Sequence, residues 1–242
     1  LIGAAGAGLA VSACSSGPER FEPRAEGHFR HGVASGDPDT NSIMLWTALS
    51  DDAGGVHRIT VNGDPAPGNP FLADTGARET FFTYGNRNIQ GMTRHPDTGE
   101  IWSHEHGPRG GDEINILRAG TNYGWPEITY GIDYSGLPIS LVTEKEGMAQ
   151  PLHYWDPSIA PSGMAFYSSD AFPLWRGQLF VGALKMRKLV RLDIRDGRVL
   201  EQEDLLTGLG ARIRDVRMGP DGALWLLTDA PRGKVYRLQP VQ

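Results

Sequence analysis

The run Pro-Asp-Thr-Gly-Glu-Ile-Trp at residues 96–102 returns further along the chain as Pro-Asp-Gly-Ala-Leu-Trp at residues 220–225. In both copies a tight turn feeds a short apolar run that ends on tryptophan, which is typical of a turn followed by a strand. The aromatic residues Trp102, Phe180 and Trp225 are spaced by 78 and 45 positions. That spacing fits a unit of about 40 to 45 residues with one copy obscured, the length of a four-stranded β-propeller blade. The repeat predicts an aromatic side chain between neighbouring blades.

Short β-rich runs alternate with turn residues over the rest of the chain. Gly, Pro, Asn or Asp clusters separate most of the expected strands, which are 43–47, 56–61, 79–83, 100–104, 114–117, 163–167, 178–182, 188–194, 223–227 and 234–238. The chain has 32 Gly and 17 Pro, a content suited to an all-β protein with many turns. No segment keeps a 3.6-residue periodicity, so long helices are not expected. The predicted fold class is all-β.

The net charge of the chain indicates which kinds of binding partner are favoured. A net charge of -6 argues against nucleic acid, which needs a basic surface. Acidic loops favour instead a cation such as Ca2+. No apolar run is long enough to span a membrane in the mature chain.

The N-terminal residues have the pattern of an export signal. Residues 1–11 are apolar and rich in Ala and Gly, and Val-Ser-Ala-Cys at 11–14 matches the lipobox of bacterial lipoproteins. We therefore expect an exported protein, periplasmic or anchored to a membrane by a lipid on Cys14. The alternative is an ordinary apolar segment with an inert cysteine. Residues 15–27 are polar and contain two prolines, as in a tether.

Residues 28–49 have a different sequence pattern from the rest of the chain. His-Gly-Val-Ala-Ser-Gly-Asp-Pro at 31–38, followed by Ile-Met-Leu-Trp-Thr at 43–47, resembles the N-terminal domain of the alkaline phosphatase D family. None of that family's metal-binding core follows, so phosphatase activity is not favoured. The expected division is a signal and lipobox segment over 1–14, a tether and phosphatase-like fragment over 15–54, and a propeller over 55–242.

Two polar clusters, at residues 84–91 and 104–115, are the densest in the chain. Their Arg, Asn and Gln side chains offer fixed donors to an anionic ligand, and Arg grips carboxylates in bidentate fashion. The Gly and Pro residues of the second cluster expose carbonyl oxygens, which are hard ligands for Ca2+. The alternative is a pair of solvated surface loops. His104 and His106 would share one face of a strand, but two histidines without a third ligand are weak evidence for zinc.

Three of the cations in the C-terminal part of the chain are candidate site residues. Lys185 follows an apolar run, and Arg212 and Arg214 are two residues apart, so they share one face of a strand. Two like charges on one face repel each other unless an anion lies between them. An acidic residue of a neighbouring blade could neutralise them, whereas Asp215 points to the other face and is a poor partner.

These clusters occur in the order typical of one family. The motifs are found at residues 85–91, 105–115, 122–126, 160–167, 182–185 and 212–216. Together they resemble the C-terminal half of the soluble PQQ-dependent sugar dehydrogenases, six-bladed propellers of the glucose/sorbosone dehydrogenase family. The resemblance covers more than three quarters of the chain and implies an incomplete propeller of about four blades.

The resemblance also implies where PQQ would bind. By position, Arg87 and Asn88 match the pair near the quinone, and Lys185, Arg212 and Arg214 match the cations around the PQQ carboxylates. This agrees with the chemistry of the residues, because PQQ carries three carboxylates and needs fixed positive charges.

Two calcium sites follow from the same resemblance. The carbonyl groups of Gly107 and Pro108 match the ligands of the Ca2+ on PQQ, an ion that polarises the quinone and favours hydride acceptance. Glu113 and Tyr123 match ligands of a second, structural Ca2+.

The implied activity is PQQ- and Ca2+-dependent oxidation of an aldose sugar to its lactone, with an unknown electron acceptor. The family's catalytic base is a histidine followed shortly by Gly-Arg in an early blade. That motif has no counterpart in this sequence, and nothing assigns the role to His28 or His31. Impaired catalysis is therefore expected, and the alternative is a non-catalytic propeller remnant that serves as a binding module.

Overall fold

The computed structural model describes residues 34–36, 42–47, 54–73 and 76–240. The expectations for the export signal, Cys14, His28 and His31 fall outside these residues. Within them the chain forms four antiparallel sheets, each built from strands that follow one another in sequence. The strands are β1 (Ala34–Gly36), β2 (Ser42–Thr47), β3 (Gly55–Thr60) and β4 (Phe81–Tyr84); β5 (Ile89–Arg94), β6 (Ile101–Glu105), β7 (Asp112–Ile116) and β8 (His153–Trp155); β9 (Pro161–Phe166), β10 (Leu179–Ala183), β11 (Lys188–Arg195) and β12 (Arg198–Leu205); and β13 (Ile213–Met218), β14 (Leu224–Thr228) and β15 (Val235–Leu238). The helices described are two 3-10 turns, η1 (Pro173–Trp175) and η2 (Thr207–Leu209).

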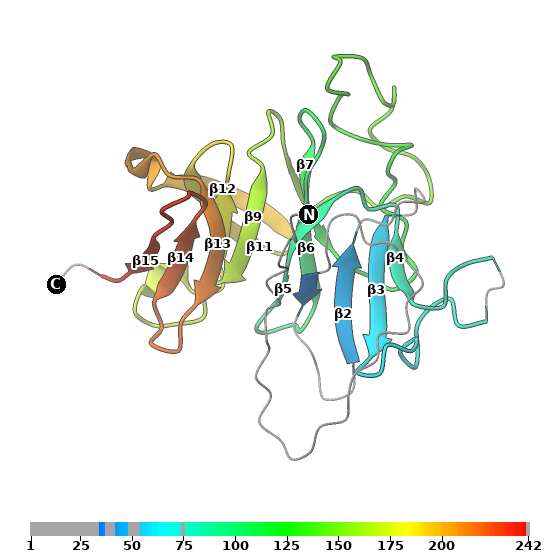
Figure 1. The fold of residues 1–242 in the computed structure, drawn as a ribbon, viewed down its shortest axis with the longest axis horizontal. Coiled ribbons are helices and arrows are strands. Elements are labelled where there is room, and N and C mark those ends of the chain that lie inside the picture. The colour runs from blue at the N-terminus through cyan, green and yellow to red at the C-terminus, as the bar shows by residue number, and fades with distance from the viewer. Residues whose placement is uncertain (1–33, 37–41, 48–53, 74–75, 241–242) are drawn as a thin grey trace, which may run out of the picture.

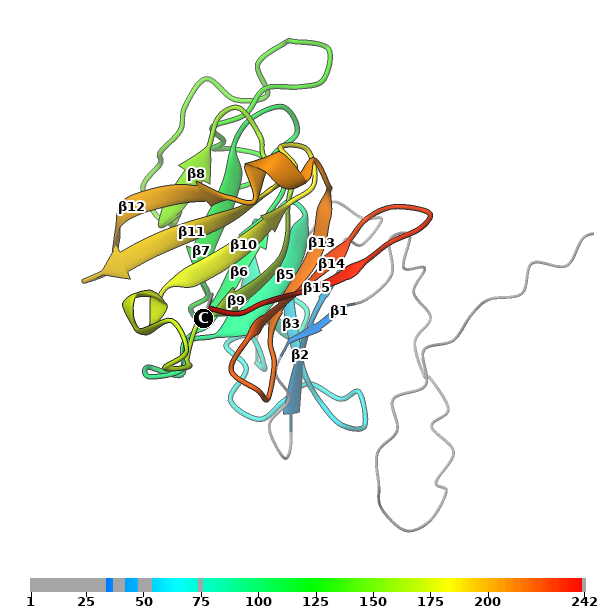
Figure 2. The same ribbon diagram turned by 90° about the vertical axis from the view of Figure 1, so that its left-hand side faces the viewer.

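The four sheets are arranged as consecutive propeller blades. Their first strands contact one another in order, β1 against β5, β5 against β9 and β9 against β13. Figure 1 shows the sheets following one another across the view, from β13–β15 on the left to β2–β4 on the right, and Figure 2 shows them from the side. The expected all-β, incomplete propeller is confirmed.

The aromatic repeat marks equivalent positions in successive sheets. Trp102, Phe180 and Trp225 are each the second residue of the second strand in their sheet. Trp102 meets Phe166 of the next sheet edge-on, with ring centroids 5.2 Å apart, and Phe180 is fully buried against the β13–β15 sheet. Trp225 remains 37% exposed, because no described sheet covers its face. Aromatic packing between blades is therefore confirmed for the first two residues.

The expectation of an obscured repeat copy is wrong. Between Trp102 and Phe180 the structure has no additional sheet; instead, residues 117–152 form a long connection between β7 and β8. Figure 1 shows this connection rising above the sheets. The spacing of 78 residues thus reflects one extended loop within a blade.

The first sheet continues across the expected domain boundary at residue 54. β2 pairs with β3 along its whole length, from Ser42 opposite Thr60 to Thr47 opposite Gly55. The division of the chain into three parts remains a prediction. No helix in the described part of the chain is long and apolar enough to cross a membrane.

Candidate functional site

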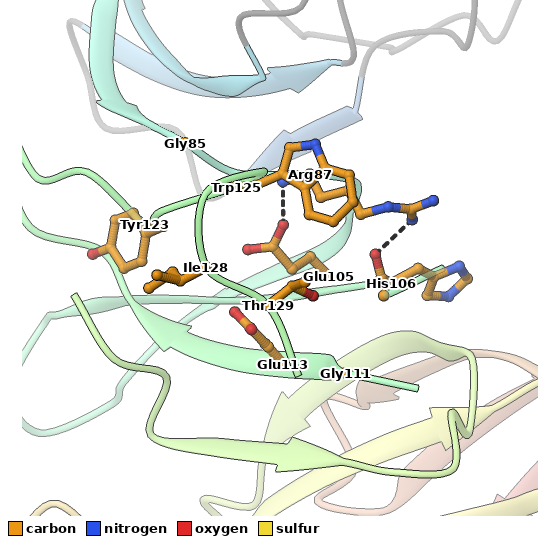
Figure 3. A pocket seen from close by; sticks show the side chains of 11 residues that line it. Gly85, Arg87, Glu105, His106, Gly111, Glu113, Tyr123, Trp125, Ile128 and Thr129 are labelled. Atoms are coloured by element: carbon orange, nitrogen blue, oxygen red, sulfur yellow. Dashed lines mark hydrogen bonds between the residues drawn. The ribbon is translucent and has the colours of Figure 1, made fainter. Parts of the chain in front are cut away.

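A small pocket opens beside the β5–β8 sheet and gathers several of the predicted site residues (Figure 3). Its lining includes Arg87, Gly107, Glu113 and Tyr123, which the sequence singled out, and Glu105 and His106, to which it gave no role. The space amounts to about 10 Å3, room for roughly one water-sized sphere.

The carboxylate of Glu105 organises the wall of the pocket. Glu105 is 4% exposed. It accepts hydrogen bonds from the main-chain N–H groups of Arg87 and Asn88 and from the side-chain amides of Asn86 and Asn115. Burial raises the pKa of Glu105, while these donors oppose the rise. The Arg87–Asn88 segment is therefore held in place by one buried acid, as Figure 3 shows for Arg87.

Arg87 lines the pocket, and within the described chain its guanidinium does not use all of its hydrogen-bond donors. Its Nη1 donates to the carbonyl oxygen of His106 at 2.8 Å, and its guanidinium sits 5.1 Å from the ring centre of Trp125. Its Nε–H is buried and has no hydrogen-bond partner among the described residues. Asn88 accepts at its carbonyl oxygen from the His106 N–H at 2.9 Å. Buried donors are rarely left unpaired, so the free Nε–H is suited to an anionic ligand.

The Gly107–Pro108 segment offers two carbonyl oxygens. Hydrogen bonds fix both ends of the loop at residues 107–110. The Gly107 N–H donates to Asp112 Oδ1 at 2.9 Å, and the Gly110 N–H donates to Ser158 Oγ at 2.9 Å. Within the described chain, neither the Gly107 nor the Pro108 carbonyl accepts a hydrogen bond. The same part of the chain contains no cluster of three His, Cys, Asp or Glu side chains that could hold a metal. A cation here would therefore depend on carbonyl oxygens, which suits Ca2+.

Glu113 lies directly opposite Glu105 in the pairing of β6 with β7. Burial and the charge of Glu105 raise the pKa of Glu113 to about 8. Tyr123 uses its hydroxyl fully, because it donates to the Ile116 carbonyl at 2.6 Å and accepts from the Arg118 N–H at 3.0 Å. Burial raises the pKa of Tyr123 to about 12. Its main-chain carbonyl, not its hydroxyl, is the oxygen left for a metal.

We expect the Glu113→Gln variant to be more stable than the wild type at pH 8 when both are free of metal. An acid whose pKa rises on folding, here from 4.5 to about 8, stays protonated in the folded state, so the unfolded state binds fewer protons between these values. The free energy of unfolding of the wild type therefore falls as the pH rises through this window, and the variant lacks this fall. Urea titrations in EDTA from pH 5 to 9 measure it. Glu144→Gln, at an exposed position, serves as the control, and equal pH slopes in Glu113→Gln and wild type would contradict the prediction.

The three C-terminal cations are not equivalent. Lys185, two residues beyond β10, is exposed and has no ion-pair partner among the residues described. Arg212 and Arg214 share one face, as predicted, and both contact Asp229 Oδ2, at 2.7 and 3.1 Å. The neutralising acid follows directly after β14 in their own sheet and does not come from a neighbouring blade, the alternative that the sequence left open. Asp215 pairs with another arginine, as its orientation predicted.

The charge of one of these arginines acts on a residue of the pocket lining. Burial lowers the pKa of His106, the hydrogen bond to Pro161 and the charge of Asp112 oppose this shift, and the positive charges of Arg87 and Arg214 add to it. Arg87 comes from the loop before β5, and Arg214 from β13, the first strand two sheets further on. The pocket therefore lies within the electrostatic field of two of the predicted PQQ-binding cations.

His104 in β6 and His106 just after it lie in different surroundings. His104 is completely buried, which lowers its pKa to about 3, although a contact with the Ser162 main chain opposes this shift. His106 Nε2 lies 2.6 Å from the carbonyl oxygen of Pro161 at the start of β9. His106 thus joins the β5–β8 sheet to the next one.

The comparisons with known proteins identify the lineage of this arrangement. A family model described as glucose/sorbosone dehydrogenase matches residues 33–237. The aldose sugar dehydrogenase YliI of Escherichia coli is 47% identical over 189 residues, which are 77% of this chain and 51% of that protein. The chain therefore spans about half the length of the curated relatives it matches.

Solved structures of similar proteins agree with the fold. A glucose dehydrogenase of 42% identity superposes with a TM-score of 0.82, covering 86% of this chain and 64% of that one. The PQQ-bound form of an aldose sugar dehydrogenase from Streptomyces coelicolor has 27% identity and a TM-score of 0.60, covering 81% of this chain and 58% of that one.

Proposed function

Because the chain belongs to the glucose/sorbosone dehydrogenase family, we propose that it forms the cofactor-binding part of a PQQ- and Ca2+-dependent aldose sugar dehydrogenase. The observation that supports this best is the pocket itself. It brings the cation Arg87 together with the Gly107 loop and the buried acid Glu113. A polyanionic quinone and a calcium ion need this combination of donors.

The residues present fit such a cofactor. Among the described residues, Arg87 retains a buried Nε–H without a partner and Lys185 forms no ion pair. Arg212 and Arg214 together carry two positive charges against the single charge of Asp229, so a positive charge is left over. Three ligand carboxylates would find cations here without displacing a full set of ion pairs.

The proposed roles follow from the chemistry of each residue. When bound, PQQ supplies a quinone that takes up a hydride from the sugar. Arg87 and Asn88 would hold the quinone end, and the carbonyl groups of Gly107 and Pro108 would bind the calcium ion beside it. Glu105 keeps the Arg87–Asn88 segment rigid, so the positioning is established before ligand arrives.

Proton removal from the sugar has no assigned residue. His106 lines the pocket, but its Nε2 is engaged by the Pro161 carbonyl, and the family's base motif has no counterpart in the sequence. We therefore expect turnover to be slow or absent. The engagement of His106 by the Pro161 carbonyl favours a second candidate function, a non-catalytic module that binds PQQ and calcium.

One experiment tests the proposal and separates the two candidates. Purified protein is titrated with PQQ in the presence of Ca2+ or EDTA, with binding followed by quenching of tryptophan fluorescence, because Trp125 lies beside Arg87. Aldose-dependent reduction of an artificial dye is then measured. Calcium-dependent binding with turnover supports the enzyme, and calcium-dependent binding without turnover supports the module. Binding of neither PQQ nor calcium would overturn the proposal.

A further inference from the structure

Asp112, the first residue of β7, is a buried acid with no ion-pair partner in the described part of the chain. It is 1% exposed. Its carboxylate accepts three hydrogen bonds, from the Gly107 N–H at 2.9 Å, the Ser158 hydroxyl at 3.0 Å and the Ala160 N–H at 2.8 Å. An ionised group at such depth is costly unless donors surround it, so its retention points to a specific positional role.

The first arm of this network controls the Gly107–Pro108 carbonyls. Asp112 Oδ1 holds the Gly107 N–H directly, and it holds the Gly110 N–H through Ser158, whose Oγ accepts from Gly110 and donates to Asp112. The loop is tightly closed, because a Cβ on Gly107 would lie 2.0 Å from the Gly110 carbonyl oxygen. With its N–H groups fixed at both ends, the loop is left with a defined orientation of its free carbonyl groups.

The second arm leads to Lys185. Asp112 Oδ2 binds the N–H of Ala160, a non-glycine residue held at a φ of 55°. That backbone conformation is uncommon and is stabilised by its surroundings. The Ala160 carbonyl accepts from the Leu184 N–H at 2.9 Å, and the Ile159 carbonyl accepts from the Lys185 N–H at 3.0 Å. The main chain that carries Lys185 is thereby tied to the same carboxylate.

We propose that Asp112 is a positioning residue that fixes the calcium-binding carbonyls and the Lys185 arm relative to each other. The inference rests on the proposed function, and it concerns a residue that would touch neither calcium nor PQQ. The Asp112 carboxylate binds two segments that are far apart in the sequence, the loop at 107–110 and the turn at 158–160. The carbonyl groups that would bind calcium and the lysine that would bind a PQQ carboxylate are therefore held by the same side chain. Residues that orient metal ligands in this way typically contribute 10- to 100-fold to metal affinity.

The Asp112→Asn variant tests the coupling. Asparagine can keep the Oδ1 contacts, but its amide NH2 would face the Ala160 N–H, so the second arm loses its acceptor. We expect a Kd for Ca2+ in the presence of PQQ that is about 10- to 100-fold weaker by calorimetry. Hydrogen exchange of residues 158–162 should also become faster in the metal-free protein. Asp193→Asn is the matched control, because Asp193 lies on β11 and, among the residues that the structure describes, pairs with Arg195 alone.

The outcomes separate this inference from the proposed function. If the wild type binds neither calcium nor PQQ, the proposed function fails, and the positioning role with it. If the wild type binds both and Asp112→Asn binds them with unchanged affinity, the positioning role alone is overturned. A purely structural role would lower the melting temperature without changing calcium affinity. Should Asp112→Asn not fold, Ser158→Ala removes one contact to the same carboxylate, and an unchanged calcium affinity in that variant overturns the inference equally.

Discussion

Gly91→Ala will lower the free energy of unfolding by about 3 kcal/mol or more, at the upper end of what overpacking costs. Gly91 lies in β5, where the added Cβ would come within 2.4 Å of His104 Nε2 and 2.7 Å of the Ser162 carbonyl oxygen. The first contact is with a completely buried ring, and the second is with main chain of the next sheet. The Ser162 carbonyl cannot move away unless β5 and β9 separate, and the His104 ring cannot move without disturbing its buried surroundings. Urea unfolding followed by tryptophan fluorescence measures the loss.

Gly208→Ala provides the control for this variant. Gly208 lies in η2, and a Cβ there meets nothing within 4 Å. It should change stability by no more than about 1 kcal/mol. In the His104→Ala background the Gly91→Ala penalty should shrink, because one of its two close contacts has been removed. Wild-type stability in Gly91→Ala would show that β5 and β9 do not approach as closely as the structure places them.

The strands that the sequence predicted correctly are those with apolar alternation or a turn motif ahead of them. β10 is buried along its whole length, and β14 alternates buried and exposed residues, so both were evident from sequence. β12 was missed because it is a mostly exposed edge strand. Its acids Glu201, Glu203 and Asp204 face Arg191 and Lys188 of β11 as ion pairs, a pattern that looks like a charged loop.

Part of the site could be predicted because its polar residues are close together in the sequence. The clusters around Arg87 and Gly107 are dense in polar residues, and the structure brings both to one pocket. Glu105 and Asp112 stand inside the second cluster, yet nothing in the sequence distinguishes a buried acid with several donors from a solvated one. Asp229, which pairs with Arg212 and Arg214, is more than a dozen residues away, and only the β13–β14 pairing brings it near.

Arg87→Met will weaken PQQ binding by about 100-fold in Kd. A hydrogen bond between charged groups contributes about 1.5 to 3 kcal/mol, and each 1.4 kcal/mol is a factor of about ten in affinity. Methionine keeps much of the apolar stem against Trp125 but supplies neither the charge nor the free Nε–H. Stability should fall only modestly, because the side chain gives up one hydrogen bond, to the His106 carbonyl. Fluorescence titration with PQQ in saturating Ca2+ measures the affinity, and thermal unfolding measures the stability.

Arg176→Met is the matched control, because Arg176 is exposed and pairs with Asp170 beside η1. Its removal tests whether the loss of any positive charge weakens binding of a trianion through the overall field, which salt would screen. A 100-fold loss confined to Arg87→Met and largely retained at 0.5 M salt would indicate direct contact with the cofactor. Equal affinities in Arg87→Met and wild type would instead mean that Arg87 only braces the loop of His106. The pocket would then lose its principal cation, and Lys185 with the Arg212–Arg214 pair would be left to bind PQQ without it.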